Sequence, residues 1–467
     1  MVDVAVAPAA GVSFPASTQI LIVGAGACGH TAALAATDAG AEVVMLERDA
    51  VPAGSTALSS GMIPACGTRF QAAKGVDDDV DRFATDILKK NHHKTDTGLG
   101  RVVCEESGPA IEWLVDTHGI ELALVDSFLY PGHSRLRMHA TPKLTGVDLI
   151  GQMLTAAQRA DIDTLCDAYT TTLYADDDGH IRGVGIIRPD GQTENIGCRT
   201  LILACNGYGG NADLLAEYIP DMRDALYFGH VGNQGDAVRW GKALGAGLAD
   251  LGAFQGHGSV ASPEGILISW ALMAEGGILV NNRGERFTNE HDGYSEQGRR
   301  VMAQPDGSAF CVYDQRLHEL GMTLPDYRDA NDIGAVRQAS SWSGLAELCK
   351  LPAETLEETL SSVAEYVSGS EPDPLGRDFT AKLALEAPCY AIRVTGALFH
   401  TQGGLEIDTR ARVLSRDGKP FNNLLAGGGA ARGLSGSSDW GYLSGNGLLT
   451  AVILGRIAGR EASRSGG

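Results

Sequence analysis

Residues 19–29 read Gln19-Ile20-Leu21-Ile22-Val23-Gly24-Ala25-Gly26-Ala27-Cys28-Gly29 and contain the pattern that decides the fold. The apolar first half predicts a buried parallel strand, and the alanine-rich stretch 30–39 predicts a helix. In the intervening Gly-x-Gly-x-x-Gly, Gly24 allows the tight turn, Gly26 lets the main chain approach a pyrophosphate, and Gly29 lets the helix pack on the strand. The helix N-terminus adds amide donors and a positive dipole. We therefore expect a dinucleotide to lie across residues 24–29.

A second short apolar segment, 42–46, predicts the next strand of the same sheet. It ends at Glu47, eighteen residues past Gly29, where a carboxylate can accept hydrogen bonds from both hydroxyls of an adenosine ribose. A glycine pattern alone also fits a turn that binds nothing. Because this pattern has its strand, its helix and its acid, the sequence favours a dinucleotide site over a plain glycine-rich turn.

Length and composition restrict the class of protein. A chain of 467 residues predicts two domains, and a formal net charge of −21 without a basic cluster argues against nucleic acid and anionic lipid as partners. The nine cysteines form no Cys-x-x-Cys pair, which favours buried free thiols in a reducing cytoplasm. No apolar run approaches the ~18 residues that span a bilayer, so no transmembrane segment is expected. His92 and His93 lack further ligands nearby, so no metal site is expected.

Three segments downstream of Glu47 are candidates for ligand contact. Residues 52–62 are rich in small and hydroxyl side chains, which suits a chain lying against a cofactor, although a flexible surface loop is the alternative. The predicted strand 199–204 runs into Cys205-Asn206-Gly207, as at the carboxyl edge of a parallel sheet, where α/β folds bind ligands. The polar stretch 133–140 fits a ligand-contacting loop and a plain basic loop equally well. Its candidate side chains are His133, Arg135, Arg137 and His139.

Periodicity places the remaining elements. Helices are predicted over 77–90, 107–118 and 147–160, and a hairpin over 170–174 and 181–188. Residues 1–17 are expected to form a loose arm. After about residue 250 the dinucleotide-fold pattern stops, and it returns near residue 386. We therefore expect a dinucleotide-binding domain built from residues 1–250 and 386–467, interrupted by a second domain at 251–385.

Seven motifs, in order along nearly the whole chain, resemble the flavoprotein family that contains fumarate reductase, succinate dehydrogenase and the 3-ketosteroid dehydrogenases. They are Gly24 to Gly29 with Glu47, Ser55 to Gly61, Gly232 to Asp236, Glu275 to Asn281, Gly284 to Glu290, His400 to Gly404, and Gly445 to Leu449. The resemblance implies an α/β fold in which a Rossmann-like FAD-binding domain is interrupted by an α+β capping domain that contacts substrate. It also implies hydride transfer between substrate and flavin N5 at the junction of the two domains.

The resemblance places FAD contacts along both parts of the first domain. Carried over motif by motif, they are Gly24, Gly26, Ala27, Cys28, Gly29, Glu47, Arg48, Ser55, Thr56, Ser59, Ser60, Gly61, Asn206, Gly207, Asp236, Gly428, Asn446, Gly447, Leu448 and Leu449. No histidine occupies residues 55–61, where the respiratory members attach their flavin, so we expect noncovalent FAD. Gly429 departs from the family, because many members have a flavin-contacting glutamate there.

The expected substrate site departs from the dicarboxylate pattern of this family. Members that act on fumarate and succinate use a Thr/Ser-Glu pair, arginines and two histidines, and the histidine positions correspond to His257 and His400. The replacements are Ser269-Trp270 for the Thr/Ser-Glu pair, and Met273, Tyr294 and Tyr442 for arginines. Because phenols and an indole cannot replace charge-assisted bidentate donors, we expect dicarboxylates to bind poorly.

The tyrosines resemble those of the ketosteroid dehydrogenases. Tyr442-Leu443-Ser444 is similar to the Tyr-x-Ser of the 3-ketosteroid Δ4-dehydrogenases, and Tyr294 falls at the position of their cap tyrosine. The resemblance implies an FAD-dependent dehydrogenase that introduces a double bond next to the carbonyl of a 3-ketosteroid or other alicyclic ketone and passes electrons to an external acceptor. Tyr294 is then the base and Tyr442 the oxyanion donor, although the two could exchange roles and Ser444 could relay the proton.

Alternative functions remain open on the sequence. The first is a fumarate-reductase-like flavoprotein that reduces an activated alkene of an organic acid. A further alternative is an FAD-binding or electron-carrier module without catalysis, in which both phenols are packing residues. The substrate's ring system is not determined by the sequence, and a homo-oligomer is left open.

Overall fold

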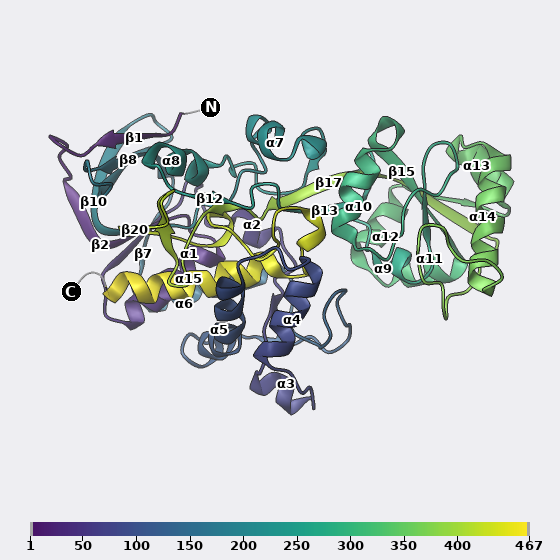
Figure 1. Ribbon diagram of the computed structural model, residues 1–467, viewed down its shortest axis with the longest axis horizontal. Coiled ribbons are helices and arrows are strands. Elements are labelled where there is room, and N and C mark those ends of the chain that lie inside the picture. The colour runs from purple at the N-terminus through teal and green to yellow at the C-terminus, as the bar shows by residue number, and fades with distance from the viewer. Residues whose placement is uncertain (1–2, 465–467) are drawn as a thin grey trace. The chain divides into compact units, whose positions relative to one another are not determined.

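The computed structural model describes residues 3–464, which divide into two compact units (Figure 1). Unit 1 covers 3–218, 229–254 and 400–464, and unit 2 covers Ile219–Phe228 and Gln255–Phe399. Unit 2 is thus longer than the expected second domain, 251–385. The reason is that strand β17 (Cys389–Thr401) belongs to the sheet of unit 2, where it also pairs with the short strand β11 (Leu226–Tyr227).

A mixed sheet forms the centre of unit 1, with strand order β1-β8-β9-β10-β2-β3-β7 and with β20 and β19 added beside β10. The strands are β1 (Ala5–Pro8), β2 (Ala16–Val23), β3 (Val43–Leu46), β7 (Asp163–Leu165), β8 (Tyr169–Ala175), β9 (Ile181–Ile187), β10 (Thr193–Leu203), β19 (Arg412–Leu414) and β20 (Pro420–Ala426). Val23, at the end of β2, lies opposite both Leu46 and Leu203 in parallel pairing. Three strands therefore end together at one edge, and each continues into a predicted cofactor segment.

Two long helices pack against each other beside this sheet. Helix α1 (Ala27–Asp38) has its first ten residues buried, and helix α15 (Asn446–Arg464) lies along it. A Cβ atom on Gly455 would stand 2.5 Å from the Cys28 carbonyl oxygen, and one on Gly459 would stand 2.1 Å from that of Ala32. The two helices can therefore approach this closely only because α15 carries glycines four residues apart on the contacting face.

The other helices of unit 1 are α2 (Gly54–Ala57), α3 (Arg69–Ala73), α4 (Val80–Lys90), α5 (Thr97–Asp116), α6 (Gly146–Arg159), α7 (Ala212–Tyr218) and α8 (Asp236–Leu244). Short strands β4 (Ile63–Pro64), β5 (Ala123–Leu124), β6 (Met138–Ala140), β12 (Leu248–Ala249) and β18 (Gly404–Leu405) complete it. Within residues 3–464 there is no helix with the length and apolar character that a membrane crossing requires.

Several predicted boundaries were wrong, for identifiable reasons. Residues 5–8 are not part of a loose arm, because β1 pairs in parallel with β8, and β2 begins at Ala16, three residues before the segment that predicted it. Met1 and Val2 lie outside the described residues. Helix α5 extends ten residues further toward the N-terminus than predicted, because burial of its face outweighs the unfavourable Gly98 and Gly100. The predicted hairpin is present as β8 and β9.

Unit 2 has an antiparallel-rich sheet with helices around it, as an α+β domain requires. Around β17 lie β11, β13 (Phe254–Ala261), β14 (Ile278–Val280), β15 (Ser308–Asp314) and β16 (Val336–Ala339). The helices are α9 (Ala271–Ala274), α10 (Tyr294–Met302), α11 (Gln315–Met322), α12 (Pro325–Asp332), α13 (Trp342–Cys349) and α14 (Ala353–Ser368). The fold class predicted from the sequence, a Rossmann-like domain interrupted by an α+β domain, is confirmed.

A buried ion network crosses the interior of unit 2. The Glu290 carboxylate accepts hydrogen bonds from Arg377 Nη1 at 2.9 Å and from Arg286 Nη2 at 2.8 Å, and Arg286 Nη1 also donates to Asp373 at 2.8 Å. The side chains of Glu290 and Arg377 are both fully buried. Arg377 further donates to the carbonyl oxygens of Met273 and Gly277. Its charge is therefore matched inside the protein.

Replacing Glu290 with alanine should destabilise unit 2 strongly, because two guanidinium groups would lose their counter-charge while they stay buried. The expected loss is about 3–5 kcal/mol of unfolding free energy, measured by urea denaturation followed by circular dichroism. The matched control is Glu285→Ala, which removes a carboxylate that is bonded to the exposed Arg283. A change for Glu290→Ala no larger than that for the control would contradict the network's structural role.

Candidate functional site

The turn between β2 and α1 has no room for side chains. Gly24 has a φ of +104°, and a Cβ atom there would stand 2.5 Å from the Ala204 carbonyl oxygen. A Cβ atom on Gly29 would stand 1.9 Å from the Gly24 carbonyl oxygen. The first glycine is therefore required by the neighbouring strand β10, and the third by the turn itself.

Polar side chains from three segments converge on this turn. Glu47 is buried at the end of β3, where Oε2 accepts a hydrogen bond from Ala25 N at 3.0 Å and Oε1 accepts one from Asp49 N at 3.1 Å. Thr56 of α2 accepts from Ala27 N at 3.0 Å through its hydroxyl. The segment that was predicted as either a cofactor loop or a surface loop is thus tied directly to the first turn of α1.

Asn206 joins α2 to the end of β10. Its φ of +66° lies in the left-handed region, and its Nδ2 donates to Ser55 Oγ at 2.9 Å. The Nδ2 of Asn233 donates to the same hydroxyl at 2.9 Å. A Cβ atom on Gly429 would stand only 2.2 Å from Asn206 Oδ1. Position 429, where the resemblance expects a glutamate, can therefore carry a side chain only if the Asn206 amide moves.

The remaining members of the 52–62 segment differ in their surroundings. Ser59 Oγ donates to the Thr56 carbonyl oxygen at 2.7 Å and accepts from Gly61 N at 3.1 Å. Gly61 has a φ of +68°, and a Cβ atom there would stand 2.7 Å from the Thr145 carbonyl oxygen. Ser60 is exposed. The first two thus shape the loop through main-chain contacts, whereas Ser60 makes no such contribution to it.

A second group lies beyond Glu47. The Arg48 guanidinium donates to the Gly232 carbonyl oxygen at 2.6 Å and stands over the ring of Tyr169, 4.5 Å from its centroid. The Tyr169 hydroxyl donates to Asp236 Oδ2 at 3.2 Å. Burial raises the pKa of Asp236, whose other oxygen has no hydrogen-bond partner among the described residues. Sequence reasoning missed Tyr169, because only the register of β8 brings it here.

The N-terminus of α15 carries a buried amide that the protein does not satisfy. Asn446 is fully buried, and neither its Oδ1 nor its Nδ2 has a hydrogen-bond partner within residues 3–464. A buried polar group left unpaired costs about 1–3 kcal/mol. Two other predicted contacts lie nearby in the chain: Leu448 and Leu449 follow Asn446 in the first turn of the helix. Gly428 has a φ of +58° and lies against Cys28. An unpaired amide at a helix N-terminus fits a bound group that offers both donors and acceptors, as a flavin ring does.

Tyr442 and His400 lie together in unit 1. Their rings meet edge to face with centroids 5.5 Å apart and planes at 74°. Burial lowers the pKa of His400 to about 4, so this imidazole is neutral at physiological pH. Ser444 is buried, and its carbonyl oxygen accepts from His133 Nε2 at 2.9 Å. Gln402, buried two residues after His400, places its amide nitrogen 2.9 Å from His400 Nδ1.

In unit 2, His257 lies in an aromatic cluster, which we define as Phe228, His257, Trp270, Tyr294 and Phe399. His257 stacks on Tyr294 with centroids 5.0 Å apart, and it meets Trp270 edge-on at 5.7 Å. Phe399 lies 5.8 Å from His257 and stacks on Phe228 at 4.9 Å. Sequence reasoning missed both phenylalanines, because a lone aromatic residue carries no motif.

His257 is also neutral. Burial lowers its pKa to about 3, and its Nδ1 accepts a hydrogen bond from the Ser259 main-chain N–H at 3.2 Å. Because a main-chain nitrogen can only donate, Nδ1 is the unprotonated nitrogen of this neutral ring and Nε2 carries the hydrogen. The cluster therefore presents neutral rings and one N–H donor.

The other predicted pocket residues are less central. Met273 is buried in the core of unit 2, and its carbonyl oxygen accepts from Arg377. Trp270 donates its indole N–H to the Glu290 carbonyl oxygen at 3.0 Å, which fixes the ring in the cluster. Ser269 accepts from Ala271 N at 3.3 Å, as a residue at the start of α9 does. We therefore take Trp270 as the member of this group that contributes most to the cluster.

The two arginines of the polar stretch 133–140 differ in burial and in their partners. The Arg137 side chain is fully buried, donates to Asp78 at 2.7 Å and 2.8 Å, and also pairs with Asp86. Arg135 is exposed and donates to main-chain oxygens of Asp77 and Ser134. The guanidinium of Arg137 is thus already committed to carboxylates of the protein.

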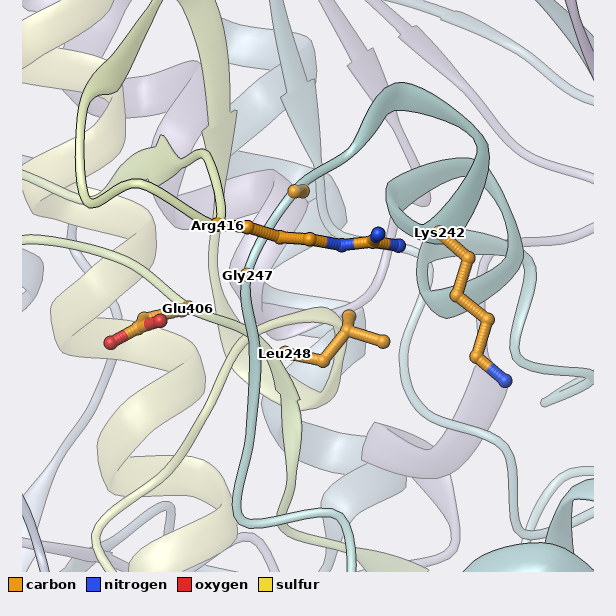
Figure 2. Close-up of a pocket in the computed structure, with 6 residues that line it drawn as sticks. Lys242, Gly247, Leu248, Glu406 and Arg416 are labelled. Carbon is orange, nitrogen blue, oxygen red and sulfur yellow. The ribbon is translucent and has the colours of Figure 1, made fainter.

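One surface pocket is separate from all predicted site residues. It measures about 470 Å³ and is lined by Lys242, Ala246, Gly247, Leu248, Glu406 and Arg416 (Figure 2). Lys242 is already paired with Glu217 at 2.9 Å. Since none of the glycine-turn, tyrosine or histidine residues lines this pocket, we do not assign it to the reaction.

The fold and the turn geometry define a two-unit flavoprotein with a Rossmann-type FAD domain. Residues 19–448 match the FAD binding domain family, and the chain belongs to this family. It is 30% identical over 451 residues to a Shewanella frigidimarina protein named probable fumarate reductase Ifc3, covering 96% of this chain and 75% of that protein. FAD is therefore the cofactor, as predicted, and the chain is an oxidoreductase that acts on CH–CH groups.

Two solved structures are similar over almost the whole chain. The open conformation of a flavocytochrome c3 fumarate reductase has a TM-score of 0.83 and 29% identity, over 98% of this chain and 80% of that one. The 3-ketosteroid-Δ4-(5α)-dehydrogenase of Rhodococcus jostii RHA1 in complex with 4-androstene-3,17-dione has a TM-score of 0.81 and 24% identity, over 98% and 99% of the two chains. The second similarity shows the fold alone. The family resemblance drawn from the motifs is confirmed.

We expect the FAD to be held without a covalent bond, since residues 55–61 contain no histidine. Precipitation of the purified protein with acid should release all of the yellow colour into the supernatant, measured by absorbance at the flavin band. Flavin fluorescence that stays with the washed pellet would contradict noncovalent binding.

Proposed function

We propose that the protein is an FAD-dependent dehydrogenase that introduces a carbon–carbon double bond α,β to the carbonyl of a 3-ketosteroid or other alicyclic ketone. The observation that carries this proposal is that each candidate tyrosine packs against a histidine that burial keeps neutral. Tyr442 lies against a neutral His400, and Tyr294 stacks on a neutral His257. Such surroundings suit a ring ketone, whereas a dicarboxylate requires charged donors.

The burial of the arginines supports the same choice. Arg377 and Arg137 are the fully buried guanidinium groups of the two units, and both are bonded to carboxylates of the protein. Binding a carboxylate at either would require breaking an existing buried ion pair, which is strongly unfavourable. The aromatic cluster instead offers the faces and edges of rings, which are suited to apolar carbon surfaces.

The proposed roles follow from the positions of the tyrosines. Tyr294 removes the α-proton, and Tyr442 donates its hydroxyl hydrogen to the carbonyl oxygen on which the enolate charge develops. Bound FAD supplies the hydride acceptor for the β-carbon. Tyr294 is the first residue of α10, so the positive end of the helix dipole favours its phenolate. Tyr442 lies four residues before the start of α15, whose first amides give that helix end a positive potential of its own.

The neutral histidines act as hydrogen-bonding groups in this scheme. Their pKa values of about 4 and about 3 lie below the ordinary imidazole value, so neither ring takes up a proton between pH 5 and pH 9. The pH dependence of flavin reduction should therefore come from the proposed base, Tyr294. Since an ordinary tyrosine has a pKa of about 10, the rate of flavin reduction should rise with pH over the neutral and alkaline range.

A second candidate is the reduction of an activated alkene of an organic acid other than a dicarboxylate. It is favoured by the identity to the Shewanella frigidimarina protein named probable fumarate reductase Ifc3. Anaerobic mixing separates the candidates. Bleaching of the oxidised flavin by a saturated cyclic ketone supports the dehydrogenase, and reoxidation of the chemically reduced flavin only by an unsaturated acid supports the reductase. No response to either class would support a module without catalysis.

Fumarate and succinate should bind poorly to the wild-type holoenzyme. At millimolar concentrations neither should turn over or change the flavin spectrum, because the positions of the family's arginines hold Met273, Tyr294 and Tyr442. The measurement is an anaerobic spectral titration, with a cyclic ketone as the positive comparison. A saturable spectral change at micromolar succinate would rule out the uncharged site.

Tyr294→Phe and Tyr442→Phe should each slow flavin reduction by at least about a hundredfold, on the scale of general-base and oxyanion effects, with FAD still bound. Only Tyr294→Phe should also abolish exchange of the substrate α-proton with deuterated solvent, and with it the rise of the rate with pH. The matched control is Tyr366→Phe, on α14 of unit 2 outside the aromatic cluster. Near-normal reduction in both active-site variants would eliminate the tyrosine mechanism and favour the reductase.

A further inference from the structure

We propose that Gln402 is a positioning residue that holds His400 as the neutral tautomer with its hydrogen on Nε2, so that His400 acts as a hydrogen-bond donor. This inference rests on the proposed function, in which His400 is one of the polar groups of the reaction. Gln402 belongs to the His400 to Gly404 motif, but the motif does not assign it a role.

Gln402 is fixed at both ends of its side chain and along its main chain. Its Nε2 lies 2.9 Å from His400 Nδ1, and its Oε1 accepts a hydrogen bond from Ser435 Oγ at 3.1 Å. Its main-chain N–H donates to the Ala253 carbonyl oxygen at 2.8 Å, and its carbonyl oxygen accepts from Gly433 N at 2.7 Å. Both Gln402 and Ser435 are buried. In this orientation of the amide, both Nε2 and Oε1 are hydrogen-bonded inside the protein.

The orientation of the amide decides the state of the imidazole. Because the Ser435 hydroxyl donates to Oε1, the NH₂ group faces His400, and an NH₂ group can only donate. His400 Nδ1 must then accept, which leaves the ring hydrogen on Nε2. His257 in unit 2 shows the same state by an independent route, since the Ser259 main-chain N–H donates to its Nδ1.

The hydrogen on His400 Nε2 lies where a donor is useful. A Cβ atom on Gly447 would stand 2.9 Å from Nε2, so the imidazole edge lies over the first turn of α15. The titratable side chain packed against the ring is Tyr442. An N–H donor here stabilises negative charge that develops nearby without losing its own proton.

The neutral state of the ring is set by its surroundings. Burial lowers the pKa of His400 to about 4, because the charged form of the ring would lose its hydration. A carboxylate in place of the Gln402 amide would reverse the arrangement, because it accepts from Nδ1 and cannot donate to it. Gln402→Glu therefore changes the proton position while it keeps the shape of the side chain.

The decisive experiment is ¹⁵N NMR of the holoenzyme labelled at histidine, with the His400 signals assigned by their loss in His400→Gln. In the wild type, His400 Nδ1 should resonate as an unprotonated nitrogen and Nε2 as a protonated one. Gln402→Glu should move the hydrogen to Nδ1, and Ser435→Ala should produce a mixture of both states, because it releases the amide. The His257 signals serve as an internal reference and should not move in any variant.

The matched control is Gln192→Glu, which makes the same change at an exposed position between β9 and β10 and should leave His400 unchanged. A protonated Nδ1 in the wild type would overturn the proposal. The proposal would also fail if the His400 signals of both Gln402→Glu and Ser435→Ala were the same as those of the wild type. These readouts do not depend on turnover.

Kinetics then separate the inference from the proposed function. Flavin reduction by a cyclic ketone should fall by at least about tenfold in Gln402→Glu, on the low side of the scale for single catalytic hydrogen bonds, with a smaller change in KM. If Gln402→Glu moves the hydrogen to Nδ1 but leaves the rate of flavin reduction unchanged, Gln402 is still the residue that positions His400. In that case His400 takes no part in the proposed reaction.

Discussion

The structure of unit 1 depends on one constraint, which is the close approach of main chains around residues 24–29. Gly24 lies against the end of β10, Gly29 lies against Gly24, and Gly455 and Gly459 bring α15 onto α1. Each approach requires that no Cβ atom be present. Because Gly455 lies on Cys28 and Gly459 lies on Ala32, α1 and α15 run in the same direction, and both helices point their N-terminal dipoles toward the same end of unit 1.

Local patterns predicted the elements that local chemistry determines. The sequence predicted strand β2, the glycine turn, helix α1, the position of Glu47 after β3, and the hairpin β8–β9. The periodicity of apolar residues, the spacing of the glycines and the lengths of the segments specify these elements. The state of Arg137 could not, because its partners Asp78 and Asp86 lie 59 and 51 residues away along the chain. Nor could Tyr169, Phe399 and Gln402, whose roles arise from pairing registers and packing directions that a single sequence does not contain.

Burial gives both units a common electrostatic character. Arginines in the interior are matched by carboxylates, whereas the two candidate histidines lack any such partner and are therefore neutral. In each case a nitrogen of the protein lies within hydrogen-bond distance of Nδ1. The protein thus places buried full charges in its ion networks, while neutral imidazoles pack against the two candidate tyrosines.

The contact between Asn206 and Gly429 has a consequence for how this protein could have diverged from its relatives. The Asn206 amide fills the space that a side chain at position 429 would need. A Cβ atom at position 429 would also stand 2.9 Å from Gly207 N, so a side chain there requires that both the Asn206 amide and the adjoining main chain shift. Across the family, the two positions should vary as a pair, and each pairing should mark a separate branch.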